Sequence, residues 1–299
     1  MLNNRIRTIR NPHSVLLPLI YKTARLWPDK LYLKLLYRLL MHKRLNLKNP
    51  RSFNEKLQWL KLYNRDPQHT LMVDKFKVKE YVANLIGAEH IIPTLGVWEN
   101  AKDVDFDSLP DKFVIKCNHN SGQGLYICKN KSKMDVEKVR SNLQQALETD
   151  YFFRFREWPY KDVERRIIAE EYIEDKSSTD GDLKDYKFMC FNGKVRCSFV
   201  CSERKTNLKV SFFDRDWNPL PFERHYPRSD KPIPQPVHYD EMIRFAEKLS
   251  QGIPFVRVDF YDVEDKIYFG ELTFFPGSGF EEFTPTIWDE TLGSYIDIS

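Results

Sequence analysis

One stretch near the C-terminus, residues 255–279, limits the possible folds most strongly because it alternates with the period of a β-strand on both sides of a short turn. Its sequence is FVRVDFYDVEDKIYFGELTFFPGSG. The first half has an apolar face and a polar face that carries Arg257 and Asp259. The second half places Glu271 and Thr273 together in the same way. Two such segments joined by a turn predict a hairpin in which an arginine, two carboxylates and a hydroxyl point into one space.

The polar face of this hairpin predicts a metal site. Two neighbouring carboxylates repel each other unless a cation lies between them. A magnesium ion, held by one or two carboxylates together with phosphate oxygens, suits such a face. Tyr261, Phe269 and Phe275 share the polar face or border it, which favours a partly enclosed cleft. The alternative is a hairpin whose polar face is solvated.

The remaining pattern predicts an α+β fold with a mostly helical first ninety residues. The dipeptide Asn192-Gly193 is the strongest turn signal and predicts a two-residue hairpin. A proline-rich loop over residues 218–237 is long enough to be a lid or a substrate loop. Strands are predicted over 90–98, 112–117, 124–130, 165–173, 185–191, 194–201 and 208–214, and later helices over 135–148, 240–250 and 288–296.

Composition indicates a soluble globular protein. The chain has 299 residues, of which 30% are charged and 41% hydrophobic, enough to bury a core. We expect neither a signal peptide nor a membrane span, because no apolar stretch is long enough and no cleavage site follows the first one. The cysteines lie in strand-like runs without zinc-site spacing, so we expect reduced, buried thiols in a cytoplasmic protein. They are Cys117, Cys128, Cys190, Cys197 and Cys201.

The positive charge is concentrated at the N-terminus. Residues 1–50 hold 11 of the 47 Lys and Arg but one of the 43 Asp and Glu, so they carry +10 and the rest of the chain carries −6. Lys30, Lys34 and Arg38 form one charged stripe on a helix rich in leucine and tyrosine. Two interpretations stay open: a helix on the anionic inner face of a membrane, or a helix packed on the protein with solvated charges. No nucleic acid partner is expected.

Two helices are predicted between residues 50 and 87. Ser52 and Glu55 have the spacing of a capping box at the start of the first helix. The second helix is predicted after Asp66-Pro67 and continues to Gly87, which places Lys75 on a helix.

Two further segments carry weaker signals. In FVIKCNHNSGQGLYIC, Lys116 ends a strand, and Gly122 and Gly124 follow in a loop whose N–H groups are able to face phosphate oxygens. Glycine-containing loops are also common in ordinary hairpins. In the strand IIAEEYI, aliphatic residues flank Glu170 and Glu171 and offer an apolar surface against which a flat nucleotide base packs. By itself this is an ordinary strand.

The order of these elements resembles the ATP-grasp superfamily. Lys75, the strand lysine Lys116 with its glycine loop, the AEEYI strand, the hairpin lysine Lys187, and the segments RVDF and GELT follow one another in that order. Three motifs, RSFNEKLQWLK, DYKFMCFNGKV and FGELTFFPGSGFEEFTP, look like the TupA-like branch, which is named for teichuronopeptide synthesis in cell-wall polymer assembly.

This resemblance implies an ATP-grasp fold, in which two α+β subdomains clamp ATP, preceded by a basic helical region. The implied regions are 1–50, basic amphipathic helices; 51–110, a helical lead-in with the first strand; 111–175, the subdomain with the glycine loop and the adenine hinge; and 176–299, the subdomain with the metal-binding hairpin.

The resemblance also implies how ATP is held. Lys75 and Lys116 match the lysines on the α- and β-phosphates, and Ser121, Gly122 and Gly124 belong to the loop that closes over the triphosphate.

At the other end of the nucleotide, Glu170, Glu171 and Ile173 match the hinge at the adenine, where the main-chain carbonyl of Glu170 accepts from the exocyclic amine. Lys187 faces the phosphates from the opposite subdomain.

The remaining implied roles concern the metal and the reaction. Asp259 and Glu271 match the magnesium ligands, and Arg257, with Lys116, matches the groups that stabilise the transition state. Thr273 stands where the superfamily usually has asparagine. A hydroxyl is a weaker magnesium ligand than a carbonyl oxygen, so this position departs from the family pattern.

The implied activity is an ATP- and Mg²⁺-dependent ligation of a carboxylate to an amine. ATP phosphorylates the carboxylate, and the amine attacks the acyl phosphate and releases phosphate. The TupA-like setting implies a sugar acid of a surface polysaccharide or its precursor as the carboxylate acceptor, and an amino acid or peptide as the amine donor. A kinase outcome stays open, since some ATP-grasp proteins are kinases.

Two other function classes remain. A glycosyltransferase is suggested by Asp214 and Asp216 in FFDRDW, a D-x-D string that is able to hold a metal on a nucleotide sugar but that also occurs in plain strand-end turns. A non-enzymatic scaffold on the membrane surface would use residues 1–50, but it would leave Arg257, Asp259 and Glu271 unexplained.

Overall fold

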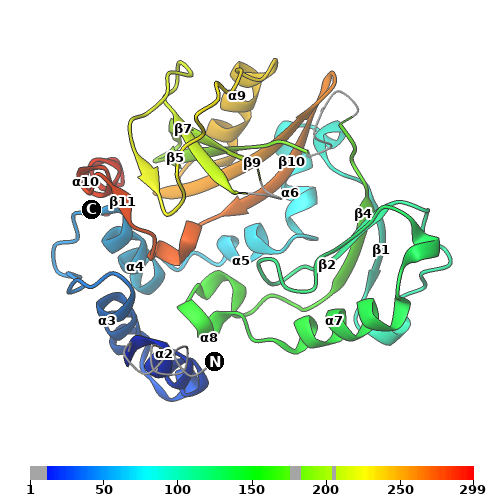
Figure 1. The fold of residues 1–299 in the computed structure, drawn as a ribbon, viewed down its shortest axis with the longest axis horizontal. Coiled ribbons are helices and arrows are strands. Elements are labelled where there is room, and N and C mark those ends of the chain that lie inside the picture. Colours follow the sequence, from blue (N-terminus) through cyan, green and yellow to red (C-terminus); the bar gives the residue numbers. More distant parts are fainter. Residues whose placement is uncertain (1–11, 176–182, 204–206) are drawn as a thin grey trace, which may run out of the picture.

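Two antiparallel sheets form the body of the molecule (Figure 1). The computed structural model describes residues 12–175, 183–203 and 207–299. One sheet has the strand order β1-β4-β2-β3 and contains β1 (Thr94–Trp98), β2 (Phe113–Cys117), β3 (Tyr126–Cys128) and β4 (Ile167–Glu171). The other has the order β10-β9-β5-β6-β7 and contains β5 (Asp185–Phe191), β6 (Lys194–Ser202), β7 (Lys209–Phe213), β9 (Phe255–Val263) and β10 (Lys266–Thr273). This α+β architecture is the predicted one.

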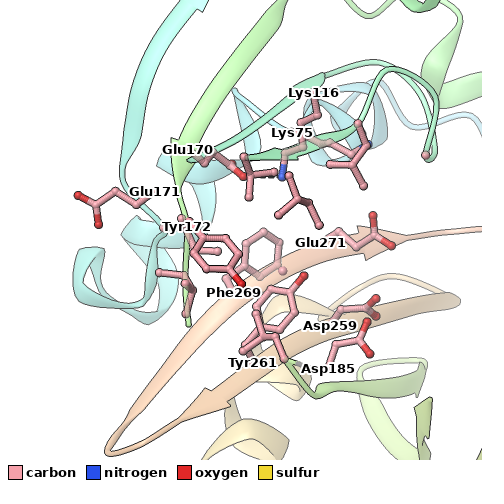
Figure 2. A pocket seen from close by; sticks show the side chains of 18 of the residues that line it. Lys75, Lys116, Glu170, Glu171, Tyr172, Asp185, Asp259, Tyr261, Phe269 and Glu271 are labelled. Atoms are coloured by element: carbon pink, nitrogen blue, oxygen red, sulfur yellow. Dashed lines mark ion pairs between the residues drawn. The ribbon is translucent and has the colours of Figure 1, made fainter. Parts of the chain in front are cut away.

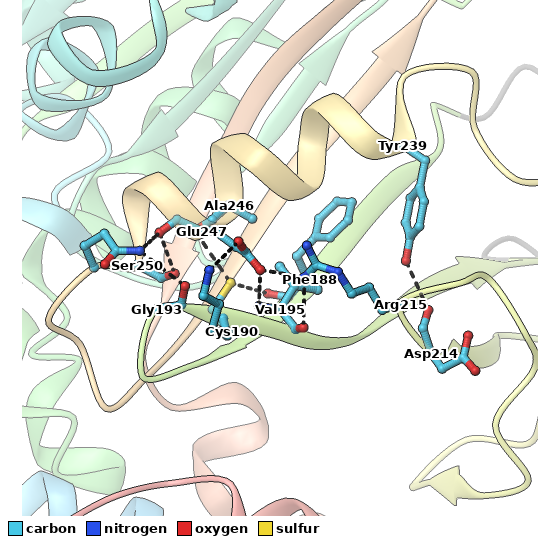
Figure 3. Close-up of polar contacts among 12 residues, drawn as sticks. Phe188, Cys190, Gly193, Val195, Asp214, Arg215, Tyr239, Ala246, Glu247 and Ser250 are labelled. Atoms are coloured by element: carbon cyan, nitrogen blue, oxygen red, sulfur yellow. Dashed lines mark hydrogen bonds and ion pairs between the residues drawn. The ribbon is translucent and has the colours of Figure 1, made fainter.

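Amphipathic helices pack on both sheets. α7 (Val136–Glu148) buries Val139 and Leu143 in the core of the four-stranded sheet, and it begins at Asp135, whose carboxylate accepts from the Lys138 N–H, as predicted. α9 (Tyr239–Leu249) belongs to the core of the five-stranded sheet. Figure 3 shows α9 lying along the β5–β6 hairpin, where Glu247 pairs with basic side chains. In both helices, residues three and four positions apart face the core, and this spacing is the reason why the sequence predicted both helices.

The predicted Asn192-Gly193 turn joins β5 to β6. Both residues have positive φ, 47° and 76°, as a two-residue hairpin of this type requires. The proline-rich segment after β7 packs on the edge of the sheet: Trp217 donates to the Ile233 carbonyl, and the Val210 N–H donates to the Pro227 carbonyl. Within it, β8 (Glu223–Arg224) pairs with β11 (Phe283–Thr284).

The helices between residues 50 and 87 differ from the prediction in one respect. The capping box of Ser52 and Glu55 starts α4 (Phe53–Tyr63), as predicted. The single helix predicted up to Gly87 is wrong, because the chain forms α5 (Gln68–Val73) and α6 (Val78–Ile86) instead. Between them the Asp74 carboxylate accepts from the N–H groups of residues 76 and 77, a local bond that competes with the helix.

From residue 12 to residue 40 the basic N-terminal segment is mostly helical and packs on the body, while residues 1–11 of the predicted region 1–50 lie outside the described residues. α2 (Pro12–Lys22) and α3 (Asp29–Leu40) bury apolar side chains against α8 (Phe152–Phe155) and Phe280. α10 (Ile287–Ser294) packs on α4 near the C-terminus. Short 3₁₀ turns complete the fold: Ala24–Leu26, Ala88–His90, Ala101–Asp103, Lys131–Lys133, Trp158–Tyr160 and Pro276–Gly279.

Two properties of the chain bear on its environment. Among the described residues, no helix combines the length and the apolar character that crossing a bilayer would need. No disulfide links the five cysteines, which all lie in the described part of the chain. Burial raises the pKa of Cys117, Cys190 and Cys197 to about 12, so these thiols are not reactive near neutral pH.

Candidate active site

A pocket of about 550 Å³ lies between the two sheets (Figure 2). Its walls come from β2, β4 and the α5–α6 turn on one side, and from β5, β9 and β10 on the other. Most of the residues singled out from the sequence line it: Lys75, Lys116, Ser121, Gly122, Glu170, Glu171, Ile173, Lys187, Asp259 and Glu271.

The β9–β10 hairpin supplies one wall. Its register pairs Glu271 with Asp259 and Thr273 with Arg257, and a bulge at Gly270 separates these pairs from the outer part of the hairpin. Arg257 donates from Nε and Nη2 to the two oxygens of Asp259 at 2.7 Å, and Nη2 also lies 2.7 Å from Oε1 of Glu271. Thr273 donates its hydroxyl to the same Oε1 at 3.1 Å. The predicted meeting of these four side chains is confirmed.

The neighbouring strand β5 adds a second ion pair to this wall. Lys187, which the register places opposite Asp259, binds the Asp259 carboxylate and lies 2.6 Å from Asp185. Asp185 was not predicted as a site residue. It shares the strand face of Lys187, two residues away, so the signal was present in the sequence.

These charges determine the protonation of the wall. Burial alone would raise the pKa of Glu271, but the positive charges of Arg257, Lys75 and Lys187 lower it to about 2. Burial would likewise lower the pKa of Lys187, yet Asp259 and Asp185 hold it above its usual value. Glu271 is therefore ionised near neutral pH, and Lys187 is charged.

The opposite wall centres on Glu170 of β4. Its carboxylate lies 2.7 Å from the ammonium group of Lys79 on α6 and 2.5 Å from that of Lys116 on β2. Burial would raise the pKa of Glu170, but the two lysines lower it. The sequence predicted a role for the Glu170 main chain alone and missed both its carboxylate and Lys79.

Lys75 reaches the pocket from the turn between α5 and α6, rather than from a helix as predicted. Its main-chain N–H donates to the Asn118 carbonyl, and its ammonium group donates to the Asn120 carbonyl at the start of the glycine loop. Burial lowers its pKa, and Glu271 across the pocket opposes that shift. Asp74 therefore positions Lys75 by breaking the helix and by accepting from the Asn118 side chain.

The loop after β2 needs its glycines for two different reasons. Gly122 has φ 79° and open space around it, so only its left-handed backbone excludes other residues. Gly124 has φ 69°, and a Cβ there would lie 2.6 Å from the Cβ of Ala146 on α7. Gly122 and Ser121 line the pocket, whereas Gly124 anchors the loop to α7.

The far end of the pocket is apolar and aromatic. Tyr172 and Ile173 follow β4, and Tyr261 and Phe269 come from the β9–β10 hairpin. In Figure 2 the rings of Tyr172, Tyr261 and Phe269 lie between the two walls, while the exposed Glu171 carboxylate points away. This end is suited to a flat ring that lies between aromatic and aliphatic side chains.

A buried polar network supports the hairpin from behind. It joins the motif RSFNEKLQWLK to the turn PGSG, which directly follows β10. Lys61 donates to the Ser278 carbonyl at 2.8 Å, and Gln58 donates to the Ser278 and Gly279 carbonyls. The Ser278 hydroxyl donates to buried Glu157 at 2.5 Å. The sequence singled out both motifs, but their contact joins residues more than two hundred positions apart and could not be predicted from local pattern.

The donor set fits a magnesium ion. Asp259, Glu271 and Thr273 offer hard oxygen atoms on one face, which is the ligand type that Mg²⁺ prefers. No group of three or more acidic, histidine or cysteine side chains within the described residues is arranged to hold a metal by itself, so substrate phosphates would have to complete the coordination. Both Asp259 oxygens accept hydrogen bonds from Arg257, and one of them also accepts from Lys187. A magnesium ion would therefore bind Asp259 oxygens that also keep, or partly give up, these hydrogen bonds.

The rival D-x-D motif forms a turn at the end of β7. Asp214 Oδ1 accepts from the N–H groups of Asp216 and Asn218, and Oδ2 accepts from the Asn218 side chain. The Asp214 carbonyl accepts from the Tyr239 hydroxyl (Figure 3). Asp214 lies outside the 550 Å³ pocket. Of the two interpretations of this motif, the structure therefore supports the turn at the end of a strand.

Solved structures of several ligases are similar to this chain at low identity. A D-alanine–D-alanine ligase from Helicobacter pylori is 16% identical with a TM-score of 0.43, over 83% of this chain and 70% of that one. A D-alanine–D-alanine ligase from Bacillus anthracis complexed with ATP is 16% identical with a TM-score of 0.38, over 68% of this chain and 53% of that one. The ATP-grasp ligase PsnB, complexed with precursor peptide PsnA2 and AMPPNP, is 10% identical with a TM-score of 0.37, over 74% of this chain and 57% of that one.

The chain thus spans between 53% and 70% of the length of these three proteins. A comparison with curated proteins gives no match. The family model named TupA-like ATPgrasp matches residues 55–297, nearly the whole chain after the N-terminal helices. The fold and the branch expected from the sequence are confirmed, and the chain belongs to the TupA-like ATPgrasp family.

Proposed function

We propose that the protein is an ADP-forming ligase that joins a carboxylate to an amine at the expense of ATP. The observation that carries the proposal is the pairing of two charged walls across one pocket. Asp259 and Glu271, which Arg257 bridges, lie on one wall, and Lys75 and Lys116 lie on the other. A polyanion such as a triphosphate with its metal fits between walls of this kind.

The nucleotide would lie with its base between Tyr172, Phe269 and the aliphatic residues of the hinge. Lys75, Lys116 and the loop at Gly122 would hold the phosphates, and Lys187 would approach them from β5. Bound Mg²⁺, held by Asp259 and Glu271, would neutralise phosphate charge. The small exposure of Arg257 and Asp259, 9% and 3%, favours strong electrostatic interactions at this point.

In the proposed reaction the bonds form between the substrates, and the protein binds and orients them. The substrate carboxylate attacks the γ-phosphorus of ATP and ADP leaves, which forms an acyl phosphate. The amine attacks the acyl carbon, phosphate leaves, and the amine gives up a proton. Arg257 would stabilise the negative charge that develops at the reacting oxygens, and the two walls would hold the reactants in position.

For the substrates we propose a sugar acid of a surface polysaccharide, or its precursor, as the carboxylate and an amino acid or peptide as the amine. This assignment rests on membership of the TupA-like branch. We place the reaction in the cytoplasm, where ATP is supplied.

Thermal unfolding tests nucleotide binding directly. Mg·ATP at about 100 times its Kd is expected to raise the melting temperature by roughly 5 °C, whereas UDP-sugars leave it unchanged. Asp259→Asn and Glu271→Gln should abolish this shift. Asp265→Asn, at the exposed tip of the same hairpin, is the matched control and should keep it. A UDP-sugar shift that is lost in Asp214→Asn, with no effect of Asp259→Asn, would overturn the ligase proposal.

The reaction type is tested by ADP release. The protein is incubated with Mg·ATP and pairs drawn from a panel of uronic acids and amino acids, and the product is identified by mass spectrometry. An amide that forms only when both partners are present supports the ligase. A phosphorylated product that forms without an amine would assign the protein as a kinase instead.

A further inference from the structure

The two N-terminal helices carry a surface that the proposed reaction does not use. Their inner face is anchored: Ile20, Ala24, Tyr32 and Leu36 are buried in one cluster to which α8 and Phe280 contribute aromatic rings. Figure 1 shows α2 and α3 at one end of the molecule, and no residue of these helices lines the 550 Å³ pocket. The orientation of both helices on the body is therefore set, and so is the side that they present to the outside.

The outer face is unusually apolar for a solvated surface. Leu16, Leu19, Leu26 and Leu31 are 40%, 58%, 82% and 52% exposed. All four fall within sixteen residues, whereas the other eight exposed large apolar side chains of the described residues are spread between Tyr63 and Tyr295. Scattered exposed leucines are ordinary, but a group on two adjacent helices and the turn between them indicates an interaction surface.

Basic side chains surround these leucines. Lys22, Lys30, Lys34 and Arg38 are exposed on the same helices, and Arg25 is exposed on the 3₁₀ turn between them. On α3, Leu31 is followed at helical spacing by Lys34 and Arg38, so an apolar and two basic side chains share one face.

The same region has almost no exposed negative charge. Asp29 is the single acidic residue among the first fifty, and it pairs with Arg156 at 2.7 Å and Arg65 at 3.0 Å. The sequence alone left open whether the basic stripe lies on a membrane or faces solvent on a packed helix. The structure has a packed inner face and a separate outer face that mixes leucine with lysine and arginine.

We propose that this outer face, the leucine and basic side chains of residues 16–38, docks on an anionic lipid bilayer. Leucines enter the boundary between headgroups and acyl chains while lysine and arginine contact the anionic headgroups. A hydrated polyanion would satisfy the cations but would leave the leucines in water. A second copy of the chain would cover the leucines but would bring two positively charged faces together. The proposal is independent of the ligase activity.

Vesicle co-sedimentation of the full chain tests it. The probes are vesicles of phosphatidylcholine alone and vesicles that contain about one third phosphatidylglycerol, at low and at high salt. The protein should partition onto the anionic vesicles at least roughly tenfold more strongly than onto the neutral ones, and high salt should weaken but not abolish this binding.

Two double variants separate the leucines from the charges. Leu26→Ser with Leu31→Ser keeps every charge and should lower partitioning roughly tenfold at both salt concentrations. Lys34→Glu with Arg38→Glu should lower it by a similar factor at low salt and much less at high salt. Matched controls are Val237→Ser, 87% exposed on the proline-rich segment, and Lys248→Glu, exposed on α9. Circular dichroism verifies that each variant is folded.

Three outcomes would overturn the proposal. The first is that the unaltered protein does not bind anionic vesicles. The second is binding that the charge variant abolishes and the leucine variant leaves unchanged, which would assign the surface to a soluble polyanion. The third is a concentration-dependent dimer, seen by analytical ultracentrifugation, that disappears in the leucine variant and leaves no vesicle binding.

Discussion

The two walls of the pocket carry opposite net charge. On the wall from the four-stranded sheet and the α5–α6 region, four lysines outnumber Glu170 and the exposed Glu171: they are Lys75, Lys79, Lys116 and Lys129. On the wall from the five-stranded sheet, Asp185, Asp259 and Glu271 outnumber Lys187 and Arg257. A magnesium–nucleotide has the complementary division, because its phosphates are anionic and its metal is cationic.

The walls also differ in how each keeps its buried charges. Glu170 is held between Lys79 and Lys116, so the cationic wall is stabilised by one central carboxylate. On the anionic wall the center is a cation, since Arg257 bridges Asp259 and Glu271. Each wall therefore has one residue that two like charges share as a counter-charge, and substitution of these two residues tests the comparison most directly.

The largest effect is expected from Arg257 on the anionic wall. Arg257→Lys keeps the positive charge but loses the two-pronged contact with Asp259 and the bridge to Glu271. Loss of one such preorganised group typically lowers kcat by about 100-fold or more, so we expect turnover measured by ADP release to fall by that factor. Mg·ATP should still raise the melting temperature. Unchanged turnover would show that Arg257 has only a structural role.

On the cationic wall, the largest effect should be on stability. Glu170→Gln leaves Lys79 and Lys116 without their common counter-charge in a buried setting. Breaking buried pairs costs about 3–5 kcal/mol, but Lys79 keeps its bonds to the Ile92 carbonyl and to Thr94, so about 2–3 kcal/mol is expected from urea unfolding. The neighbouring exposed residue supplies the control, since Glu171→Gln should change the free energy of unfolding by less than about 0.5 kcal/mol. Equal effects of the two variants would contradict this assignment.

The sequence revealed more of the anionic wall than of the cationic one, for a physical reason. Arg257, Asp259, Glu271 and Thr273 lie on two strands joined by a short turn, so strand periodicity brings them together. On the cationic wall, Lys79 meets Glu170 across ninety-one residues, and no local pattern encodes that contact. The break at Asp74 had a signal, because aspartate competes for backbone N–H groups, but the apolar periodicity around it favoured one continuous helix.

The smallest expected effect is a dependence on pH at Glu271. Its pKa is about 2 in the folded chain and 4.5 when unperturbed, so the ionised carboxylate stabilises the fold at every pH above 4.5. This stabilisation is lost as the pH falls from 4.5 towards 2. The Glu271 side chain is 37% exposed, so solvent screening reduces its contribution to about 1–2 kcal/mol.

Urea unfolding of the unaltered protein and of Glu271→Gln at several pH values measures this contribution. We expect the unaltered protein to be more stable at pH values of about 6, and the difference between the two to shrink as the pH approaches about 3. Glu290→Gln, exposed on α10, is the control and should show no such trend. A difference that stays constant over this range would mean that Arg257, Lys75 and Lys187 do not act on Glu271 through its charge, and the anionic wall would then have to be held together by packing alone.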